Sequence, residues 1–217
     1  MYHEALSYIE DVTKRVEMTE PNEYRLRKKE ATRALVDEEW PLAVLLKILH
    51  HPNRSIQIEY HGKDYKYDAT MKLSGTQSVL EDWDNPVPVE VTAAYHEHAP
   101  YLREELAQKG HSYGPPDIHR AKNGEVISKA AVVEADNLHN GIATEAVRCL
   151  RKKYKKDYPP NTIILCALFD QIPLPHAAWD NIHKLVWDSH NGSIPYLTYI
   201  VDTFTCQYTS VRKTQIG

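Results

Sequence analysis

The sequence predicts an α/β protein with three layers, in which helices cover both faces of a central mixed sheet. Three observations predict this class. Strand patterns at residues 55–62, 63–75 and 86–95 follow one another across short turns, which is typical of an antiparallel meander. The continuous apolar run at residues 162–170 is typical of a central strand buried on both faces. Helical patterns with one apolar stripe precede the meander and alternate with the later strands.

The first long helical pattern spans residues 21–49, with apolar side chains at spacings of three, four and seven. Pro41 interrupts it, so we expect either a kink or a second helix that begins at Pro41. Glu38 lies within the apolar stripe and is expected to point toward the sheet, or to be exposed if the helix frays at Pro41. The stripe consists of Ala31, Leu35, Leu42, Leu45, Leu46 and Leu49.

Segment 86–95 alternates strictly and places one glutamate opposite its valines. The valines share one face, which leaves Glu90 on the other. On an edge strand Glu90 would be an ordinary solvated side chain. On a central strand covered on both faces it would be a buried charge that needs a partner or a metal ion.

Asp68 would meet Glu90 if segments 63–75 and 86–95 pair as strands. Two carboxylates on one face repel each other unless a cation lies between them, and oxygen ligands of this type suit Mg²⁺ or Mn²⁺. Two separate surface charges are the alternative interpretation. The apolar face of the first segment would hold Tyr65, Tyr67, Ala69, Met71 and Leu73, and the face of Asp68 would hold Lys66, Thr70 and Lys72.

The later patterns complete the order of elements. Helices are predicted at residues 96–110, 140–158 and 175–190, and a last strand at residues 194–204. Between the first two helices lie a loop with an Asn-Gly turn and a segment that fits either a strand or part of an insertion. We therefore expect a single domain over residues 1–217 with an insertion near residues 110–135.

Basic residues are clustered although the net charge is −4. Residues 148–156 contain six Lys or Arg in nine positions, and residues 25–33 contain five in nine. Such patches are compatible with phosphate contacts, and a solvated helix face is the alternative.

Lys153 is the one cation on the inner stripe of the predicted helix 140–158, which consists of Ile142, Ala146, Cys149 and Leu150. A lysine held against a core needs a carboxylate or a phosphate, unless its ammonium reaches water at the helix end. Arg148, Arg151 and Lys155 face outward, and Lys152 and Lys156 flank the stripe.

Asp68 in KYDATM and Glu90 in VEVT, within this order of elements, resemble the motif of the PD-(D/E)XK nuclease superfamily. The resemblance implies a restriction-endonuclease-like core over roughly residues 21–204, with metal ligation by Asp68 and Glu90. A glutamate of the first helix often joins the site in this superfamily, and Glu38 is the matching candidate. Segment 90–114 is also similar to a segment of uncharacterised bacterial proteins of this fold.

The sequence departs from the superfamily pattern at Thr92, which replaces the lysine of E-x-K. That lysine would orient or deprotonate the attacking water and balance charge in the transition state. Relatives move it to a neighbouring helix or replace it, so Lys153 is the expected substitute, with Lys66 and Lys72 as further candidates.

These observations predict a metal-dependent nuclease that cleaves nucleic acid, with DNA as the expected substrate and Mg²⁺ or Mn²⁺ as cofactor. The backbone would be held by Arg148, Arg151, Lys152 and Lys155. The resemblance also implies a homodimer. Because Thr92 replaces the lysine, the alternative is a nuclease-fold protein that binds nucleic acid or a protein partner without cutting. A third hypothesis, a histidine metalloenzyme, rests only on His96 and His98 directly after a strand.

Other features indicate a reducing cytoplasm. The acidic N-terminal residues 1–15 predict no secretory signal, and no apolar run approaches the length of a membrane span. The three widely spaced cysteines fit buried thiols better than a disulfide frame or a zinc site. Glycine-rich nucleotide-binding motifs, G-x-S-x-G and paired C-x-x-C are absent, which argues against ATPases, dinucleotide oxidoreductases, serine hydrolases of the elbow type and zinc fingers.

Overall fold

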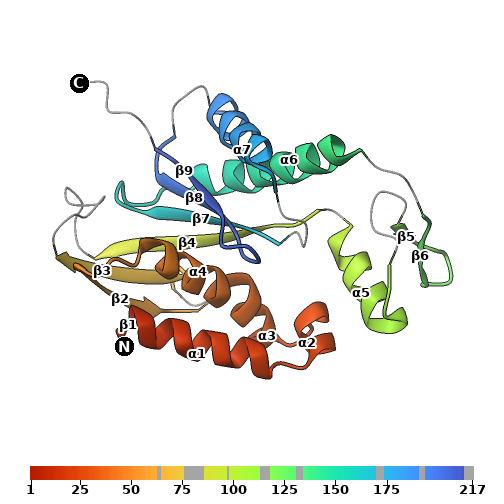
Figure 1. Cartoon of the computed structure of the whole chain (residues 1–217), viewed down its shortest axis with the longest axis horizontal. Coiled ribbons are helices and arrows are strands. Elements are labelled where there is room, and N and C mark those ends of the chain that lie inside the picture. The colour runs from red at the N-terminus through yellow and green to blue at the C-terminus, as the bar shows by residue number, and fades with distance from the viewer. Residues whose placement is uncertain are drawn as a thin grey trace.

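A mixed sheet of seven strands, in the order β1-β2-β3-β4-β7-β8-β9, forms the centre of the protein, with helices on both faces (Figure 1). The three-layer α/β/α class predicted from the sequence is therefore confirmed. The computed structural model describes residues 1–62, 65–75, 86–96, 98–112, 118–130, 134–169, 174–190 and 194–212.

The strands of the main sheet are β1 (His3–Glu4), β2 (Arg54–Tyr60), β3 (Ala69–Gly75), β4 (Val87–Ala94), β7 (Ile163–Leu168), β8 (Leu197–Asp202) and β9 (Tyr208–Val211). The α-helices are α1 (Ala5–Met18), α2 (Pro21–Leu26), α3 (Glu30–Ala34), α4 (Trp40–Leu49), α5 (Ala99–Lys109), α6 (Ala135–Tyr154) and α7 (His176–Asp188), and η1 (Leu35–Glu39) is π-helical. A separate hairpin consists of β5 (Ile118–Arg120) and β6 (Val126–Ser128).

Antiparallel and parallel pairing meet at β4. Strands β1 to β4 pair antiparallel, as the predicted meander requires, whereas β4, β7 and β8 pair parallel and β9 closes the far edge antiparallel. Parallel neighbours need long crossovers, which contain α6 and α7 here. All residues of β7 are buried, as its apolar run predicts.

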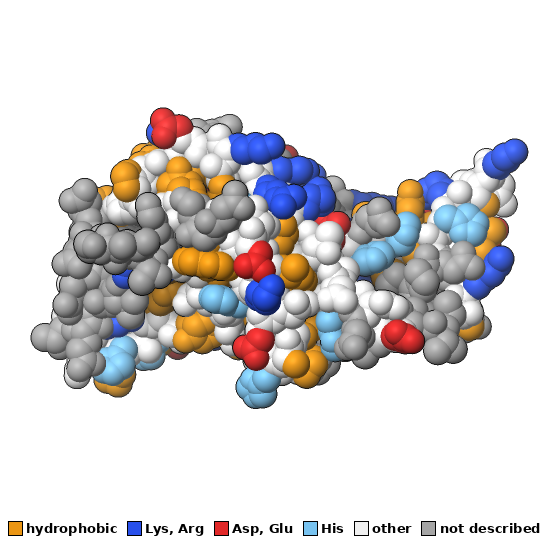
Figure 2. Space-filling model, turned by 90° about the horizontal axis from the view of Figure 1, so that it is seen from above, with side chains coloured by type: hydrophobic (Ala, Val, Ile, Leu, Met, Phe, Trp, Pro, Cys, Tyr) orange, Lys and Arg blue, Asp and Glu red, His pale blue; other side chains and the backbone are white. Residues whose placement is uncertain are grey.

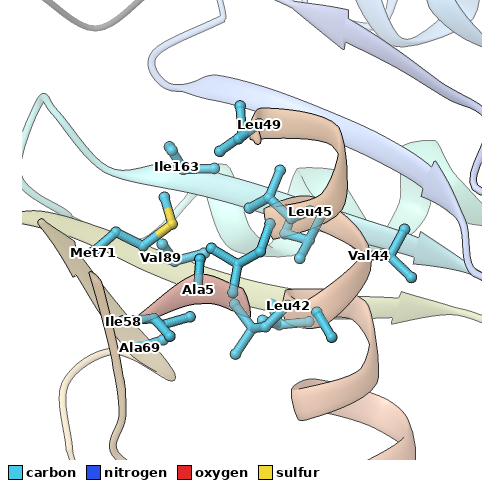
Figure 3. Packing of buried hydrophobic residues seen from close by; sticks show 14 of the residues in the cluster. Ala5, Leu42, Val44, Leu45, Leu49, Ile58, Ala69, Met71, Val89 and Ile163 are labelled. Atoms are coloured by element: carbon cyan, nitrogen blue, oxygen red, sulfur yellow. The ribbon is translucent and has the colours of Figure 1, made fainter. Parts of the chain in front are cut away.

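Two hydrophobic cores lie on the two faces of the sheet. The first packs α1 and α4 against the valines of β4 and their neighbours on β2, β3, β7 and β8. Figure 3 shows side chains of α4 beside those of β2, β3, β4 and β7. The second core packs α6 and α7 against the opposite face, including Ala94, Ile164 and Cys166. The strict alternation along β4 therefore assigns Glu90 to the side of α6.

The helical pattern at residues 21–49 is broken at Arg27, so the expectation of an interruption at Pro41 alone was wrong. Arg27 ends α2 in the left-handed conformation, with φ of +51°, which is costly for a residue with a Cβ atom. Its side chain compensates by forming an ion pair with Asp37 and a hydrogen bond to Tyr95 Oη. These long-range contacts were not visible in the local sequence pattern.

Pro41 lies in the first turn of α4, directly after the π-helical segment η1. Proline has no N–H and leaves the carbonyl group of Asp37 without its usual helical partner. The Trp40 N–H instead bonds to the carbonyl of Leu35, five residues back, so a wider turn carries the helix across the proline. Because residues 30–49 are helical without interruption, the alternative of a second helix that begins at Pro41 was wrong.

The segment before β3 departs from the predicted alternation. β3 begins at Ala69, so Asp68 lies just before the strand rather than within it. Tyr65 is 61% exposed and stacks on His61, while Tyr67 packs against the second core rather than the first. The prediction that Tyr65 and Tyr67 extend the apolar face of Ala69 was therefore wrong.

The expected insertion near residues 110–135 is described in part, because residues 113–117 and 131–133 lie outside the described residues. Its described part forms the β5–β6 hairpin, which packs against α5. Gly124 has φ of +89° and donates its N–H to the carbonyl of Ala121 at 2.9 Å. This confirms the predicted Asn-Gly turn.

Both edge strands, β1 and β9, were missed because they are short and polar: two residues, His3–Glu4, and four residues, Tyr208–Val211. The prediction of buried free thiols is confirmed for Cys149 and Cys166. It was wrong for Cys206, which is free but exposed. Among the described helices, none has the length and apolar character required to cross a membrane.

Candidate active site beside β3, β4 and α6

The register of β3 and β4 brings Asp68 next to Glu90. Ala69 pairs with Val89 and Thr70 with Pro88, and one further step of the same antiparallel register places Asp68 opposite Glu90. The Val91 N–H donates to Asp68 Oδ2 at 2.7 Å. This hydrogen bond fixes the Asp68 carboxylate beside β4, on the face that the period of two predicts for Glu90.

Glu90 is a buried charge with two lysine partners. Its side chain is 7% exposed, and the Lys153 Nζ lies 2.5 Å from Glu90 Oε1. The Lys156 Nζ lies 3.5 Å from the same oxygen. A carboxylate on a covered central strand is costly unless a cation meets it, and the last turn of α6 supplies that cation.

Lys153 reaches Glu90 because it continues the buried stripe of α6. The stripe residues Ala146, Cys149 and Leu150 are buried against the sheet, and Lys153 follows Leu150 by three residues, which keeps it on the same helix face. Its side chain is only 18% exposed. The structure therefore places Lys153 beside Glu90 rather than in solvent.

The negative charge of Glu90 affects the pKa of Asp68. Burial, followed by repulsion from Glu90, raises the pKa of Asp68 from 3.8 to about 6, while the Val91 N–H and Lys153 act in the opposite direction. Functional sites often contain two neighbouring carboxylates whose mutual repulsion raises the pKa of one of them. A divalent cation between them would relieve the repulsion.

Glu38 lies at the margin of this group. It is half-buried, Tyr60 Oη donates to its Oε2 at 2.5 Å, and its charge contributes to the raised pKa of Asp68. Its two neighbours in η1 are engaged elsewhere, Asp37 by Arg27 and Glu39 by Arg15. Of these three successive acidic residues, Glu38 is the one whose charge contributes to the raised pKa of Asp68.

Two residues of the site had no role predicted from the sequence, although Lys156 was expected to flank the inner stripe of the helix. Lys156 lies one helical turn after Lys153, and this spacing could have indicated its role. Tyr158 is buried, and its pKa is raised first by burial and then by Glu90. Its ring packs edge-on against Tyr196, with centroids 5.6 Å apart. No local pattern identifies Tyr158, because it follows the end of α6.

The other lysine candidates lie elsewhere. The Lys72 Nζ lies 3.9 Å from the centroid of the Tyr2 ring, and the Lys66 Nζ lies 5.7 Å from that of Tyr67. Within the described chain, neither lysine pairs with Asp68 or Glu90. Thr92 is half-buried beside Cys149, whose pKa is raised mainly by burial. An uncharged threonine cannot supply the positive charge of the lysine that it replaces.

The basic residues predicted to hold a nucleic-acid backbone are exposed: Arg148, Arg151 and Lys152 lie on α6, and Lys155 directly follows its last residue. Arg148 is partly engaged, because its Nη2 lies 2.7 Å from Glu145 Oε2. Figure 2 views the molecule from the side of α6 and α7 and shows Lys and Arg side chains gathered near the centre of this face. This face can therefore attract phosphates electrostatically.

The donor chemistry of the site is compatible with Mg²⁺ or Mn²⁺ but supplies few ligands. Asp68 and Glu90 offer carboxylate oxygens, which these ions prefer. Among the described residues, no group of three or more His, Cys, Asp or Glu side chains could hold a metal ion. His96 and His98, with ring centroids 5.2 Å apart, therefore have no third ligand there. A metal at Asp68 and Glu90 would keep several waters, as Mg²⁺ commonly does.

Comparisons with models of protein families, with curated proteins and with solved structures give no match to this chain. The resemblance to the PD-(D/E)XK superfamily therefore rests on the motif residues and on the order of elements.

The raised pKa of Asp68 predicts a pH-dependent stability. Because this pKa is about 6 in the folded protein and 3.8 ordinarily, the contribution of Asp68 to stability is fully present below about pH 4 and is lost as the pH rises through 6. In EDTA, the free energy of unfolding of the parent, relative to Asp68→Asn, should fall by roughly 2 to 3 kcal/mol between pH 4 and 7. Urea unfolding of both proteins between pH 4 and 7 measures this difference. The same pH dependence of the free energy of unfolding in both proteins would contradict the prediction.

Proposed function

We propose that the protein is a metal-dependent nuclease that hydrolyses phosphodiester bonds in nucleic acid, with DNA as the expected substrate. The observation that carries the proposal is the contact between buried Glu90 and Lys153, on the sheet face where Asp68 meets Glu90. Two carboxylates and one lysine in this arrangement can serve phosphoryl chemistry although Thr92 occupies the usual lysine position.

Each side chain has a role that follows from its place. Asp68 and Glu90 would hold Mg²⁺ or Mn²⁺, which supplies Lewis-acid activation of the phosphate and of a bound water. The Lys153 ammonium would stabilise negative charge that develops on the phosphate. Glu38, bonded by Tyr60, would act at the margin through water. The backbone would be held by Arg148, Arg151, Lys152 and Lys155.

Two further expectations belong to this proposal. The homodimer implied by the superfamily resemblance would present two sites to the two strands of a duplex, and sedimentation equilibrium measures it. The cytoplasm remains the expected compartment, where thiols such as the exposed Cys206 stay reduced.

A second function is favoured by one specific observation. Both Lys153 and Lys156 already lie within 4 Å of Glu90, so the charge of Glu90 is compensated without a metal ion. A protein of this kind would bind nucleic acid or a protein partner without cutting. Its binding would not depend on Mg²⁺ or on the Glu90 carboxylate.

Cleavage assays separate the two functions. Supercoiled plasmid, linear duplex, single-stranded DNA and RNA are incubated with Mg²⁺, Mn²⁺ or EDTA. We expect metal-dependent cleavage by the parent, lowered at least about a hundredfold in Glu90→Gln and in Asp68→Asn. Glu10→Gln, which changes an exposed glutamate on α1, is the matched control and should cleave normally.

Two results would reject the nuclease. One is cleavage that persists unchanged in folded Glu90→Gln and Asp68→Asn, which would place the activity elsewhere. The other is an absence of cleavage with every substrate and metal, combined with nucleic-acid binding that EDTA leaves unchanged, which would establish the second function.

A further inference from the structure

A pocket of about 380 Å³ lies between α2 and α5 and is lined by residues that the candidate active site does not use. Two cations, Lys28 and Arg103, and two amides, Asn22 and Gln108, contribute to its wall. This volume lies within the range of sites for small ligands. The pocket therefore combines room for a ligand with polar donors on its wall.

Arg103 carries a positive charge that Asp37, the ion-pair partner of Arg27, offsets only in part. Its guanidinium carbon lies 4.8 Å from the centroid of the Tyr95 ring, and that of Arg27 lies 5.0 Å from the same centroid. Arg27 has an ion pair with Asp37, whereas Arg103 forms none with any residue that the structure describes. Arg103 is half-buried, and burial followed by the charge of Arg27 lowers its pKa. An anion in the pocket would remove this repulsion.

Glu104, the acidic residue of the pocket wall, is bound by a different arginine. Arg120 donates hydrogen bonds to both oxygens of Glu104, from Nη1 to Oε1 at 3.2 Å and from Nη2 to Oε2 at 2.5 Å. This bidentate pair satisfies the Glu104 carboxylate. The exposed Lys28 adds a second positive charge at the rim, and this charge also contributes to the lowered pKa of Glu104. The side of the pocket formed by Lys28 and Arg103 is therefore cationic.

We propose that this pocket binds a phosphate group, with Arg103 and Lys28 as its cationic contacts. A guanidinium matches phosphate oxygens in a planar, two-pronged geometry, and the lysine at the rim adds a mobile point charge. The apolar wall of Leu26, Pro100 and Ala107 leaves space for the nucleoside that a nucleotide carries. The phosphate can come from a free nucleotide or from a nucleic-acid strand, and the proposal does not depend on cleavage at Asp68 and Glu90.

Calorimetry with AMP and with adenosine tests the phosphate requirement directly. The parent should bind AMP at low ionic strength, and adenosine at least about tenfold more weakly. Lys28→Ala should weaken AMP binding about fivefold, as expected for one exposed charge contact. Arg103→Gln should weaken it at least about tenfold. Lys14→Ala, which removes an exposed lysine from α1, is the matched control and should bind like the parent.

A second arm identifies the source of the phosphate. Fluorescence anisotropy in EDTA measures the affinity for a labelled single-stranded oligonucleotide without cleavage. Losses for both AMP and the oligonucleotide in Lys28→Ala support a general phosphate pocket, and a loss for the oligonucleotide alone supports a site for the strand backbone.

Unchanged affinities for AMP and the oligonucleotide in Lys28→Ala and in folded Arg103→Gln would overturn the proposal. Circular dichroism checks folding, since Arg103 packs on Tyr95. If Arg103→Gln unfolds, Lys28→Glu decides the matter, because reversing an exposed charge should weaken both ligands further than Lys28→Ala does.

Discussion

Replacing Lys153 by methionine should lower the free energy of unfolding at pH 8 by about 3 kcal/mol, because it leaves a buried carboxylate without its closest partner. The side chain of Glu90 is 7% exposed and that of Lys153 is 18% exposed, so little water can reach the Glu90 carboxylate and stabilise its charge in place of Lys153. Lys156, at 3.5 Å from Glu90 Oε1, compensates in part, which places the expected loss at the low end for a broken buried pair. Urea unfolding at pH 8 measures this loss.

Two further measurements separate the charge of Lys153 from its volume. Methionine keeps the length of the side chain, so packing changes little, and Lys153→Arg should retain most of the stability because it retains the charge. Since Lys153 lowers the pKa of Asp68, Lys153→Met should raise that pKa above its present value near 6, which carboxyl NMR can follow. Lys14→Met is the control. A Lys153→Met protein as stable as the parent, with an unchanged Asp68, would contradict the ion pair.

The second large effect concerns the first core. Leu45 is fully buried between α4 and the sheet, among the side chains that Figure 3 shows. Leu45→Ala should lower the free energy of unfolding by about 3 to 5 kcal/mol, because a cavity remains where the side chain was. Leu6→Ala is the matched control, since Leu6 is 55% exposed, and should change stability by less than about 0.5 kcal/mol. A similar small change for both variants would contradict this packing.

The sheet could be predicted from the sequence wherever one face of an element is buried continuously. The alternation along β4 and the unbroken apolar run of β7 carried enough information to assign the layers and the central strands. The break at Arg27 could not be predicted, because the left-handed residue is held by Asp37 and Tyr95, which are distant in sequence. The short edge strands β1 and β9 depend on their neighbours for pairing and have no pattern of their own.

The candidate site was predictable for the residues that lie on regular elements. A period of two places Glu90, and the helical period places Lys153 on the stripe that faces it. Tyr158 comes after the end of its helix, and the cationic pocket is formed by α2 and α5, which are separated in the sequence by β2, β3 and β4. Such contacts depend on tertiary packing, which the local periodicity of the sequence does not predict.

The π turn of η1 determines how this part of the chain would respond to a deletion. A π turn holds one residue more than an α turn, so removing one residue from Leu35–Glu39 would leave α3 and α4 close to their present orientation but would restore α-helical hydrogen bonding directly before Pro41. The ring of Pro41 would then meet the carbonyl group four residues before it. The extra residue of η1 therefore allows one continuous helix to contain the proline and still hold Glu38 beside Tyr60.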